Sequence, residues 1–358
     1  MPQHPDGARP AAVAMLATLC IATLAGLAAA VLGIPLPWMI GPLFAIAGLR
    51  LAGLQLLAPR GGRHAGQWAI GATLGLYFSP AVVAQLSLNA PLLLAIAFCA
   101  IPVGMLCALL LRRLTATDTA TAFFCALPGG ASEMATLAER RGASAERVAT
   151  AHALRMMLVV VVIPFVIVHA DAHGSDLWEP LARSVDWSRL PLLVGASLAG
   201  VALLRGLRLP NAWILGALAG VALPTALGYP LSALPAWVVN GGQLLIGVSL
   251  ATRFSPAFVR AAPRFILAAS ASTGLGMLSL ALLAGLLSWA LEVPLATVVL
   301  ASAPGGVTEM SITAQFLHLG VPLVTAAHVL RVIVLSLSAA AACRLFERWL
   351  ERAEQTRG

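Results

Sequence analysis

The sequence Pro128-Gly129-Gly130-Ala131-Ser132-Glu133-Met134 returns in the second half of the chain as Pro304-Gly305-Gly306-Val307-Thr308-Glu309-Met310. Nineteen residues after each glutamate comes a histidine, and three residues later an arginine, at His152 and Arg155 and again at His328 and Arg331. These acids and bases fall within apolar surroundings that hydropathy places in a membrane. A charged group there costs on the order of 3 kcal/mol even on a lenient insertion scale, so it is rarely present without a partner or a task. The repeated stretch therefore marks the predicted functional site.

The composition indicates a membrane protein that crosses the bilayer many times. The 358 residues are 60% hydrophobic and only 10% charged, with a mean hydropathy of +0.92. Water-soluble domains are about 25% charged. The 22 basic residues are all arginines, scattered singly or in pairs between apolar runs. This pattern is typical of topology signals and not of a nucleic-acid-binding face.

Apolar stretches of about 20 residues predict ten membrane-crossing helices. They lie near 11–33, 37–57, 64–86, 89–111, 146–169, 190–207, 210–228, 235–258, 265–289 and 321–343. Two further stretches, 117–140 and 293–317, hold the Pro-Gly-Gly sequences. The predicted organisation is a cytoplasmic N-terminus (1–10), a first membrane repeat (11–169), an external connection (170–189), a second repeat (190–343) and a cytoplasmic tail (344–358).

A fixed offset relates the two halves. At 176 residues, Gln67, Ile70, Gly71, Leu74, Phe78, Ser79 and Pro80 recur as Gln243, Ile246, Gly247, Leu250, Phe254, Ser255 and Pro256. The Pro-Gly-Gly stretch and the histidine and arginine after it keep the same offset. Apolar composition alone could align leucines and alanines, but not this mixture of residue types. We conclude that the chain is an internal duplication.

Arginine counts decide how the halves face the membrane. If both Pro-Gly-Gly stretches cross, twelve arginines lie inside and eight outside. If each stretch enters the membrane and returns on the same side, the counts become eighteen and two. Cytoplasmic loops carry an excess of arginine, so the second arrangement is favoured, with both termini in the cytoplasm of a bacterial inner membrane. Five crossings per half then make the two repeats inverted, and the tips of the two re-entrant hairpins can meet near the bilayer midplane.

Broken helices at equivalent positions of inverted repeats point to a transporter's binding site. The predicted site residues are Gly129, Gly130, Ser132, Glu133, His152, Arg155, Gly305, Gly306, Thr308, Glu309, His328 and Arg331. In the functional interpretation, each glutamate carries a proton or cation, and each arginine is its partner or contacts an anionic solute. In the structural interpretation, an ion pair between glutamate and arginine locks the hairpin to a helix. Ser132 and Thr308 are expected to cap new half-helices.

The repeat, with Pro37-Trp38-Met39-Ile40-Gly41-Pro42-Leu43 near the first spans and Pro-Gly-Gly-x-Ser/Thr-Glu-Met farther on, resembles the bacterial AbrB family of duplicated membrane proteins. This family is distinct from the DNA-binding regulator of the same name. The resemblance covers about 11–346, although Ala212 and Ala217 replace the prolines of the first copy. Family members carry labels that include a regulator of gene expression and an ammonia monooxygenase.

The residues do not favour the monooxygenase label. The seven histidines form no His-x-His pair, and the five cysteines have no Cys-x-x-Cys spacing, so no metal site, cofactor or enzymatic activity is expected. We expect a secondary transporter of a small polar or charged solute, coupled to protons or cations. The alternative is a membrane-embedded sensor or indirect regulator without transport. The expected partners are that solute and the lipid bilayer, with no nucleic acid, and the sequence leaves a homodimer open.

Overall fold

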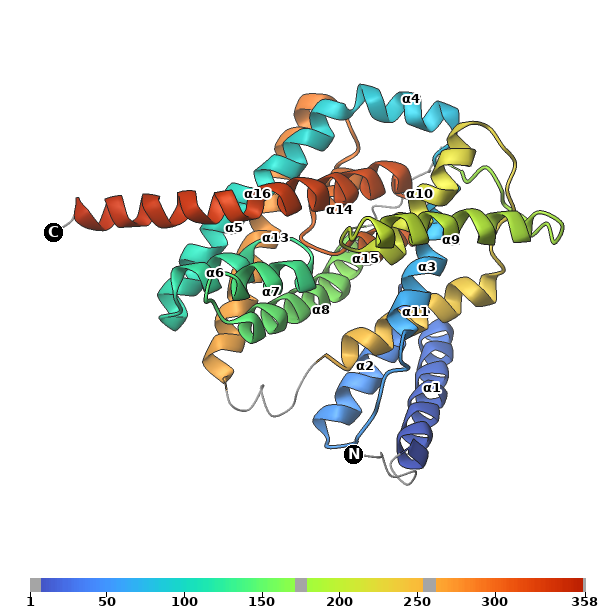
Figure 1. The fold of residues 1–358 in the computed structure, drawn as a ribbon, viewed down its shortest axis with the longest axis horizontal. Coiled ribbons are helices and arrows are strands. Elements are labelled where there is room, and N and C mark those ends of the chain that lie inside the picture. The colour runs from blue at the N-terminus through green and yellow to red at the C-terminus, as the bar shows by residue number, and fades with distance from the viewer. Residues whose placement is uncertain (1–7, 171–178, 254–261, 357–358) are drawn as a thin grey trace. The chain divides into compact units, whose positions relative to one another are not determined.

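The computed structural model describes residues 8–170, 179–253 and 262–356, and within these ranges the chain forms helices and no strands. The helices of the first half (Figure 1) are α1 (Ala8–Val31), α2 (Pro37–Leu51), α3 (Gly62–Gly75), α4 (Pro80–Leu88), α5 (Ala90–Thr115), α6 (Thr119–Ala126), α7 (Ala131–Glu139) and α8 (Ala145–His169). Those of the second half are α9 (Leu190–Gly206), α10 (Ala212–Ala226), α11 (Ala236–Ala251), α13 (Pro263–Leu291), α14 (Leu295–Ser302), α15 (Val307–Leu317) and α16 (Val321–Gln355).

An all-helical fold with several helices able to cross a membrane is therefore confirmed. Among the described residues, α1, α5, α8, α13 and α16 are long and apolar enough to cross a membrane. The expected spans at α2, α9, α10 and α11 are apolar helices of 15 to 17 residues, shorter than predicted. Left-handed residues directly before α2 and α10 fix where those two helices begin, at Leu36 and Asn211.

The expected span 64–86 is a bent pair and not one helix. Between α3 and α4 the chain turns by 89°. Pro80 opens α4, where its missing N–H removes no helical hydrogen bond. The Phe-Ser-Pro element thus ends one helix and starts another, and its second copy at Phe254, Ser255 and Pro256 lies outside the described residues.

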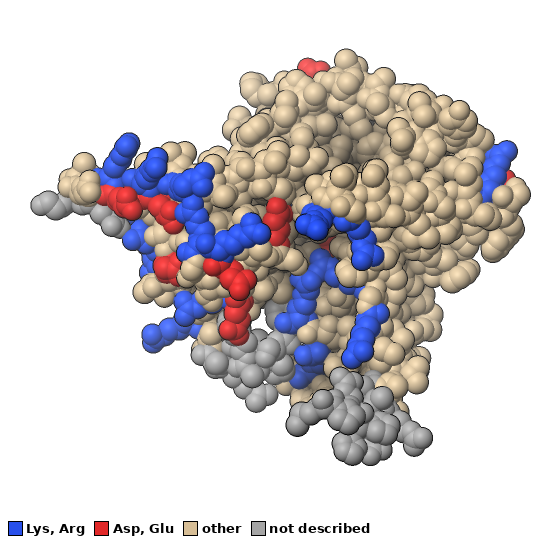
Figure 2. Space-filling model, in the orientation of Figure 1, with Lys and Arg blue, Asp and Glu red and all other residues tan. Residues whose placement is uncertain are grey.

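The predicted tail from Arg344 is the continuation of α16, which runs without a break to Gln355 (Figure 1). Figure 2 shows charged side chains gathered over this end of α16, while wide areas of the same face carry none. Uncharged areas of this size are expected of helices that face lipid.

The described helices form two compact units that do not coincide with the two sequence repeats. The first unit comprises Met1–Val83 and Trp178–Ala261, and the second comprises Ala84–Leu177 and Ala262–Gly358. Each unit therefore takes equivalent segments from both repeats, and each Pro-Gly-Gly stretch lies in the second unit. The two halves of the chain thus exchange segments, and neither repeat forms a unit by itself.

Helix packing in the first unit is the same when the repeats are interchanged. Helix α1 packs on α2 as its equivalent α9 packs on α10. Helix α2 packs on α11 as its equivalent α10 packs on α3. At the centre, α3 packs on its equivalent α11, where a Cβ on Gly66 would lie 2.5 Å from the carbonyl oxygen of Gly242. Only glycine permits this approach of the two backbones. Because equivalent helices contact each other, the unit has the pattern of a two-fold relation.

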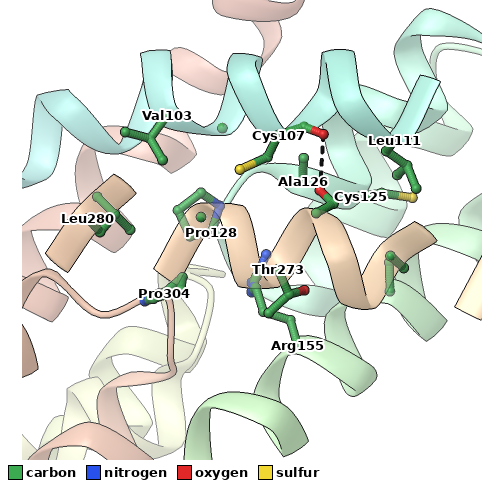
Figure 3. Close-up of a pocket in the computed structure, with 15 residues that line it drawn as sticks. Val103, Cys107, Leu111, Cys125, Ala126, Pro128, Arg155, Thr273, Leu280 and Pro304 are labelled. Carbon is green, nitrogen blue, oxygen red and sulfur yellow. Dashed lines mark hydrogen bonds between the residues drawn. The ribbon is translucent and has the colours of Figure 1, made fainter. Parts of the chain in front are cut away.

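In the second unit, too, helices from equivalent positions of the two repeats contact each other, and these are α5 and α13. They pack side by side, and the Ser272 hydroxyl on α13 donates to the carbonyl oxygen of Cys107 on α5 at 3.0 Å. Figure 3 shows Val103 and Cys107 following one another in the direction opposite to Thr273 and Leu280. The two equivalent helices therefore run antiparallel.

Candidate functional site

Each Pro-Gly-Gly stretch separates two short helices. The first, α6, begins at its N-cap Asp118, whose carboxylate accepts from the Thr121 amide at 2.8 Å, and ends at Ala126. Leu127 and Gly130 have extended backbone, and α7 then begins at Ala131. Proline at position 128 has no N–H to continue the helix, so the chain must break here.

Two hydrogen bonds show that this helix pair is a hairpin. The Ser144 amide, at the start of α8, donates to the Thr121 hydroxyl at 2.9 Å. Farther along α8, Arg155 donates to the carbonyl oxygen of Leu127 at 2.9 Å. Helix α6 therefore runs parallel to α8, and α7 must return to the start of α8, beside which both lie (Figure 1).

The second hairpin has the same arrangement. Gly320, directly before α16, lies against the Thr297 side chain in the first turn of α14, while Arg331 reaches the end of α14 at Ser302. The returning helix α15 is fixed to α16 by a hydrogen bond from the Thr325 hydroxyl to the Ser311 hydroxyl at 2.9 Å. Both motifs thus fold into helical hairpins with Pro-Gly-Gly tips.

In the first repeat, His152 and Arg155 bind the hairpin tip through its backbone. His152 Nε2 lies 2.8 Å from the carbonyl oxygen of Phe124, and Arg155 donates to His152 Nδ1 at 3.1 Å. Arg155 also donates to the carbonyl oxygens of Leu127 and Gly129, at 2.9 and 3.3 Å. A carbonyl only accepts and a guanidinium only donates, so His152 is the neutral Nε2–H tautomer.

The second repeat forms the same clamp, with shorter distances from the arginine to its acceptors. His328 Nε2 lies 2.9 Å from the carbonyl oxygen of Leu300, and Arg331 donates to His328 Nδ1 at 2.8 Å. Arg331 donates to the carbonyl oxygens of Ala303 and Gly305 at 2.6 and 2.5 Å. Arg331 is 2% exposed, so the charge of its guanidinium is stabilised almost entirely by these acceptors.

The position of the arginines has a physical reason. The last carbonyl groups of a helix have no partner within it, and together they carry partial negative charge. Each arginine lies at the end of the first helix of its hairpin. There its guanidinium donates hydrogen bonds to these carbonyl groups, and its positive charge balances their partial negative charge. The expected ion pair is not found in the first repeat: among the described residues, no hydrogen bond or ion pair joins Glu133 to Arg155.

The first glycine of each tip packs against a methionine side chain, which leaves no space for a Cβ at that position. A Cβ on Gly129 would lie 2.8 Å from the Met134 side chain, and one on Gly305 would lie 2.7 Å from that of Met310. Both methionines are fully buried. The thioether therefore fills the concave side of the tip, and the Gly and Met of the repeated motif form one packing unit.

The predicted N-caps are wrong by two residues. Gly130 and Gly306 are the N-cap residues of α7 and α15, so Ser132 and Thr308 lie at the second helical position. Glutamate then falls at the third position, from which a carboxylate can reach back to the N-cap backbone. In the second hairpin the Glu309 carboxylate does lie over Gly306, where it would meet any added Cβ.

The two tips differ in their surroundings. Thr308 and Glu309 are both buried, at 4% exposure each. Ser132 is exposed and Glu133 is half-buried, but Oε2 of Glu133 is a buried atom without a hydrogen bond. On α16, Oγ of Ser336 is also a buried atom without a hydrogen bond.

A small cavity in the second unit brings the two tips together. Pro128 and Pro304, the first residues of the two repeated stretches, both line it, as does Arg155 (Figure 3). Its volume is about 20 Å³, which is room for about one water molecule. Sequence reasoning missed most of its lining, which comes mainly from α5, α6 and α13 and includes Val103, Cys107, Leu111, Cys125, Ser272, Thr273 and Gly276.

The arrangement offers hydrogen-bond donors and few other reactive groups. Nε of Arg155 and Nε of Arg331 are buried without hydrogen-bond partners. Within the described ranges, no group of three or more His, Cys, Asp or Glu side chains could hold a metal ion. The two unpaired Nε groups can donate hydrogen bonds to a polar solute or to water.

Most of the chain is similar to known proteins. The profile of one family, described as "Transition state regulatory protein AbrB", matches residues 38–347. A Bacillus subtilis (strain 168) protein named "Uncharacterized protein YhjN" is 28% identical, with 88% of each chain covered. An Escherichia coli (strain K12) protein named "Putative regulator AbrB" is 26% identical, over 88% of this chain and 91% of its own length. No solved structure matches.

Proposed function

Because the chain belongs to the AbrB family and its described part contains at least five helices able to cross a membrane, we propose that it is a secondary transporter. The transported solute is small and polar or charged, and the protein lies in the bacterial inner membrane with both termini in the cytoplasm. The eighteen-to-two distribution of arginines supports this orientation.

One observation carries the proposal. Two hairpins from different halves of the chain bring their Pro-Gly-Gly tips to the same cavity, where Pro128 and Pro304 both contribute to the lining. Backbone that leaves the helix at membrane depth is tolerated only where it is buried in protein or lines a cavity. Tips that meet in this way are the arrangement from which transporters build their sites.

The antiparallel packing of equivalent helices supports inverted repeats. In the second unit α5 and α13 run in opposite directions beside the cavity (Figure 3). In the first unit Gly62 of α3 lies against Leu245 of α11, and Gly66 lies against Gly242, which is again an antiparallel order. Inverted repeats allow two related conformations that open the site to opposite sides of the membrane, as alternating access requires.

The histidine and arginine pairs have a positioning role in this mechanism. By holding the carbonyl groups of both tips, they fix the geometry of the cavity without catalysing a reaction. The free Nε groups of Arg155 and Arg331 leave donor capacity beside the tips. The cavity holds about one water molecule, so solute entry requires one tip to move away from the other.

The proposal is tested first by binding and then by flux. The purified full-length protein is heated with organic anions, amino acids, amines and metal ions; a ligand at a hundredfold excess over Kd stabilises it by about 2.7 kcal/mol. A ligand that shifts the melting temperature is then loaded into proteoliposomes under an imposed gradient. Gradient-driven flux that is lost in the Arg155→Met variant supports transport at the tips, whereas binding without flux contradicts it.

A sensor is the second candidate function. It is favoured by the word regulator in the name of the Escherichia coli relative. A sensor binds its ligand at the same tips but moves no solute across the membrane. The proteoliposome measurement separates the two functions, because only a transporter accumulates or releases the ligand.

A further inference from the structure

The cavity at the two tips has one charged side chain in its lining, and that side chain is a cation. Arg155 reaches it from α8 (Figure 3). Among the described residues that line the cavity, none is an Asp or a Glu. The other polar side chains of the lining carry hydroxyl or thiol groups, and they are Ser272, Thr273, Cys107 and Cys125. The lining therefore supplies a positive charge and no negative one.

The charge of Arg155 is not balanced by an acidic side chain. Only 5% of Arg155 is exposed, and it donates to the carbonyl oxygens of Leu127 and Gly129 and to Nδ1 of His152. Within the described part of the chain it forms no ion pair. Its Nε is a buried donor without an acceptor. Buried charges are normally paired and buried donors are nearly always satisfied, and a bound anion would meet both requirements.

The equivalent arginine of the second repeat has a different position. Nε of Arg331 is also unpaired, but Arg331 is not among the described residues that line the cavity. It donates to its own tip at 2.6 and 2.5 Å, whereas Arg155 donates to its tip at 2.9 and 3.3 Å. Arg331 therefore holds a tip, and Arg155 is the arginine that can also contact a ligand in the cavity.

The size and the charge of the cavity limit the ligand. The cavity has room for about one water molecule, so it fits a small anionic group. One guanidinium balances one negative charge, and a dianion would keep a second, unpaired charge in a buried site. The Thr273 hydroxyl on α13 can donate a further hydrogen bond to the same group.

We propose that this cavity binds a small monovalent anion, either a halide or a carboxylate group, through the guanidinium of Arg155 and the hydroxyl of Thr273. The inference rests on the proposed function, for which it names the class of solute: an anion, and not a cation or an amine. The anion joins α8 of the first repeat to α13 of the second, beside the two tips.

The test uses the purified full-length protein and simple salts as probes. Sodium gluconate, whose anion is too large for the cavity, is replaced stepwise by sodium chloride or sodium formate at constant ionic strength, and the melting temperature is measured. An anion that binds only the folded protein gives a saturable rise. Choline salts of the same anions should give the same rise, which separates an anion effect from a cation effect. The salt that acts at the lower concentration identifies a halide or a carboxylate.

Arg155→Met should abolish the response, but this variant also loses hydrogen bonds to the tip. A pair of glycine variants on α13 leaves those bonds in place. A Cβ on Gly276, which lines the cavity, would lie 3.2 Å from Sγ of Cys107, so Gly276→Ala narrows the cavity. It should weaken the apparent anion affinity by about tenfold or more, which is about 1.4 kcal/mol.

Gly274→Ala is the matched control. It makes the same change two residues away, where an added Cβ would meet nothing within 4 Å, and it should leave the response as in the wild type. Thr273→Val keeps the shape of the side chain, removes the hydroxyl, and should also weaken the response.

Two results would overturn the proposal. One is a wild-type protein that unfolds cooperatively with no saturable anion response, as a cavity that holds only water would give. The other is an equal response in the wild type and Gly276→Ala. Transport is tested separately by flux: anion binding without anion flux would contradict transport and keep the anion site. Flux of a cation or an amine without any anion response would keep transport and overturn the anion site.

Discussion

Arg141 and Glu347 form an ion pair of 3.0 Å between the loop after the first hairpin and the C-terminal end of α16. The two residues must therefore lie on the same side of the membrane. In the twelve-span arrangement Arg141 is outside and the tail is inside, which this contact excludes. A hairpin that enters and returns on one side satisfies it, and this was the arrangement that the arginine counts favoured.

This contact predicts the topology. Reporter domains fused after Arg141 and after the C-terminus should both report the cytoplasm, because the two positions are adjacent in the second unit. A reporter after Leu317, at the end of the second hairpin, should report the opposite side if the repeats are inverted. Alkaline phosphatase and green fluorescent protein fusions measure this in cells. Reports from opposite sides for the first two fusions would contradict the hairpin.

Loss of the Arg331 guanidinium should destabilise the protein strongly. In Arg331→Met the carbonyl groups of Ala303 and Gly305 and the Nδ1 of His328 lose a charged donor, at a cost of about 2–5 kcal/mol. Arg155→Met should cost less, because its bonds to the tip are longer, at 2.9 and 3.3 Å. Thermal unfolding in detergent measures both. Arg348→Met, at an exposed position of α16, is the matched control and should have almost no effect.

The packing of Gly305 against Met310 predicts a compensating pair. Gly305→Ala places a methyl group 2.7 Å from the Met310 side chain and should destabilise by about 1–3 kcal/mol through overpacking. In Gly305→Ala/Met310→Ala the methyl group has space, so the double variant should lose less stability than the sum of the two single variants. Additive losses in a double-mutant cycle would show that the thioether does not limit this position.

Within the first unit, a hydrogen bond joins α3 to α9. The indole Nε1 of Trp68 donates to the Ser197 hydroxyl at 2.9 Å, and Ser197 is fully buried. Ser197→Ala leaves the indole without an acceptor and should cost about 1–3 kcal/mol. Trp68→Phe/Ser197→Ala removes both partners and should recover part of that loss. Equal thermal stability of Ser197→Ala and the wild type would contradict a stabilising role.

Several features of the fold could be predicted from the sequence because their causes are local. Hydropathy predicted the apolar helices, although α2, α9, α10 and α11 are shorter than expected because helix ends depend on single turn residues. The Pro-Gly-Gly sequence predicted the helix breaks, since proline cannot continue the backbone hydrogen bonds. The exact N-caps were missed, because glycine can occupy that position without a capping side chain.

The candidate site was predicted only in part. The sequence brought His152 and Arg155 to the first hairpin and His328 and Arg331 to the second. It did not show that the arginines bind backbone carbonyl groups, because such groups are present at every residue and leave no signal in the sequence.

The sequence by itself determined a duplicated, helical membrane protein with a charged motif at two helix breaks and a strong arginine asymmetry. These properties follow from hydropathy, backbone chemistry and charge counts, which act within a turn or a span. Only the tertiary structure decided that the repeats exchange segments to form two units, that both tips line one cavity, and that the Glu309 carboxylate covers Gly306. Each of these depends on side chains far apart in the chain, whose contacts are set by packing between the repeats and not by either repeat alone.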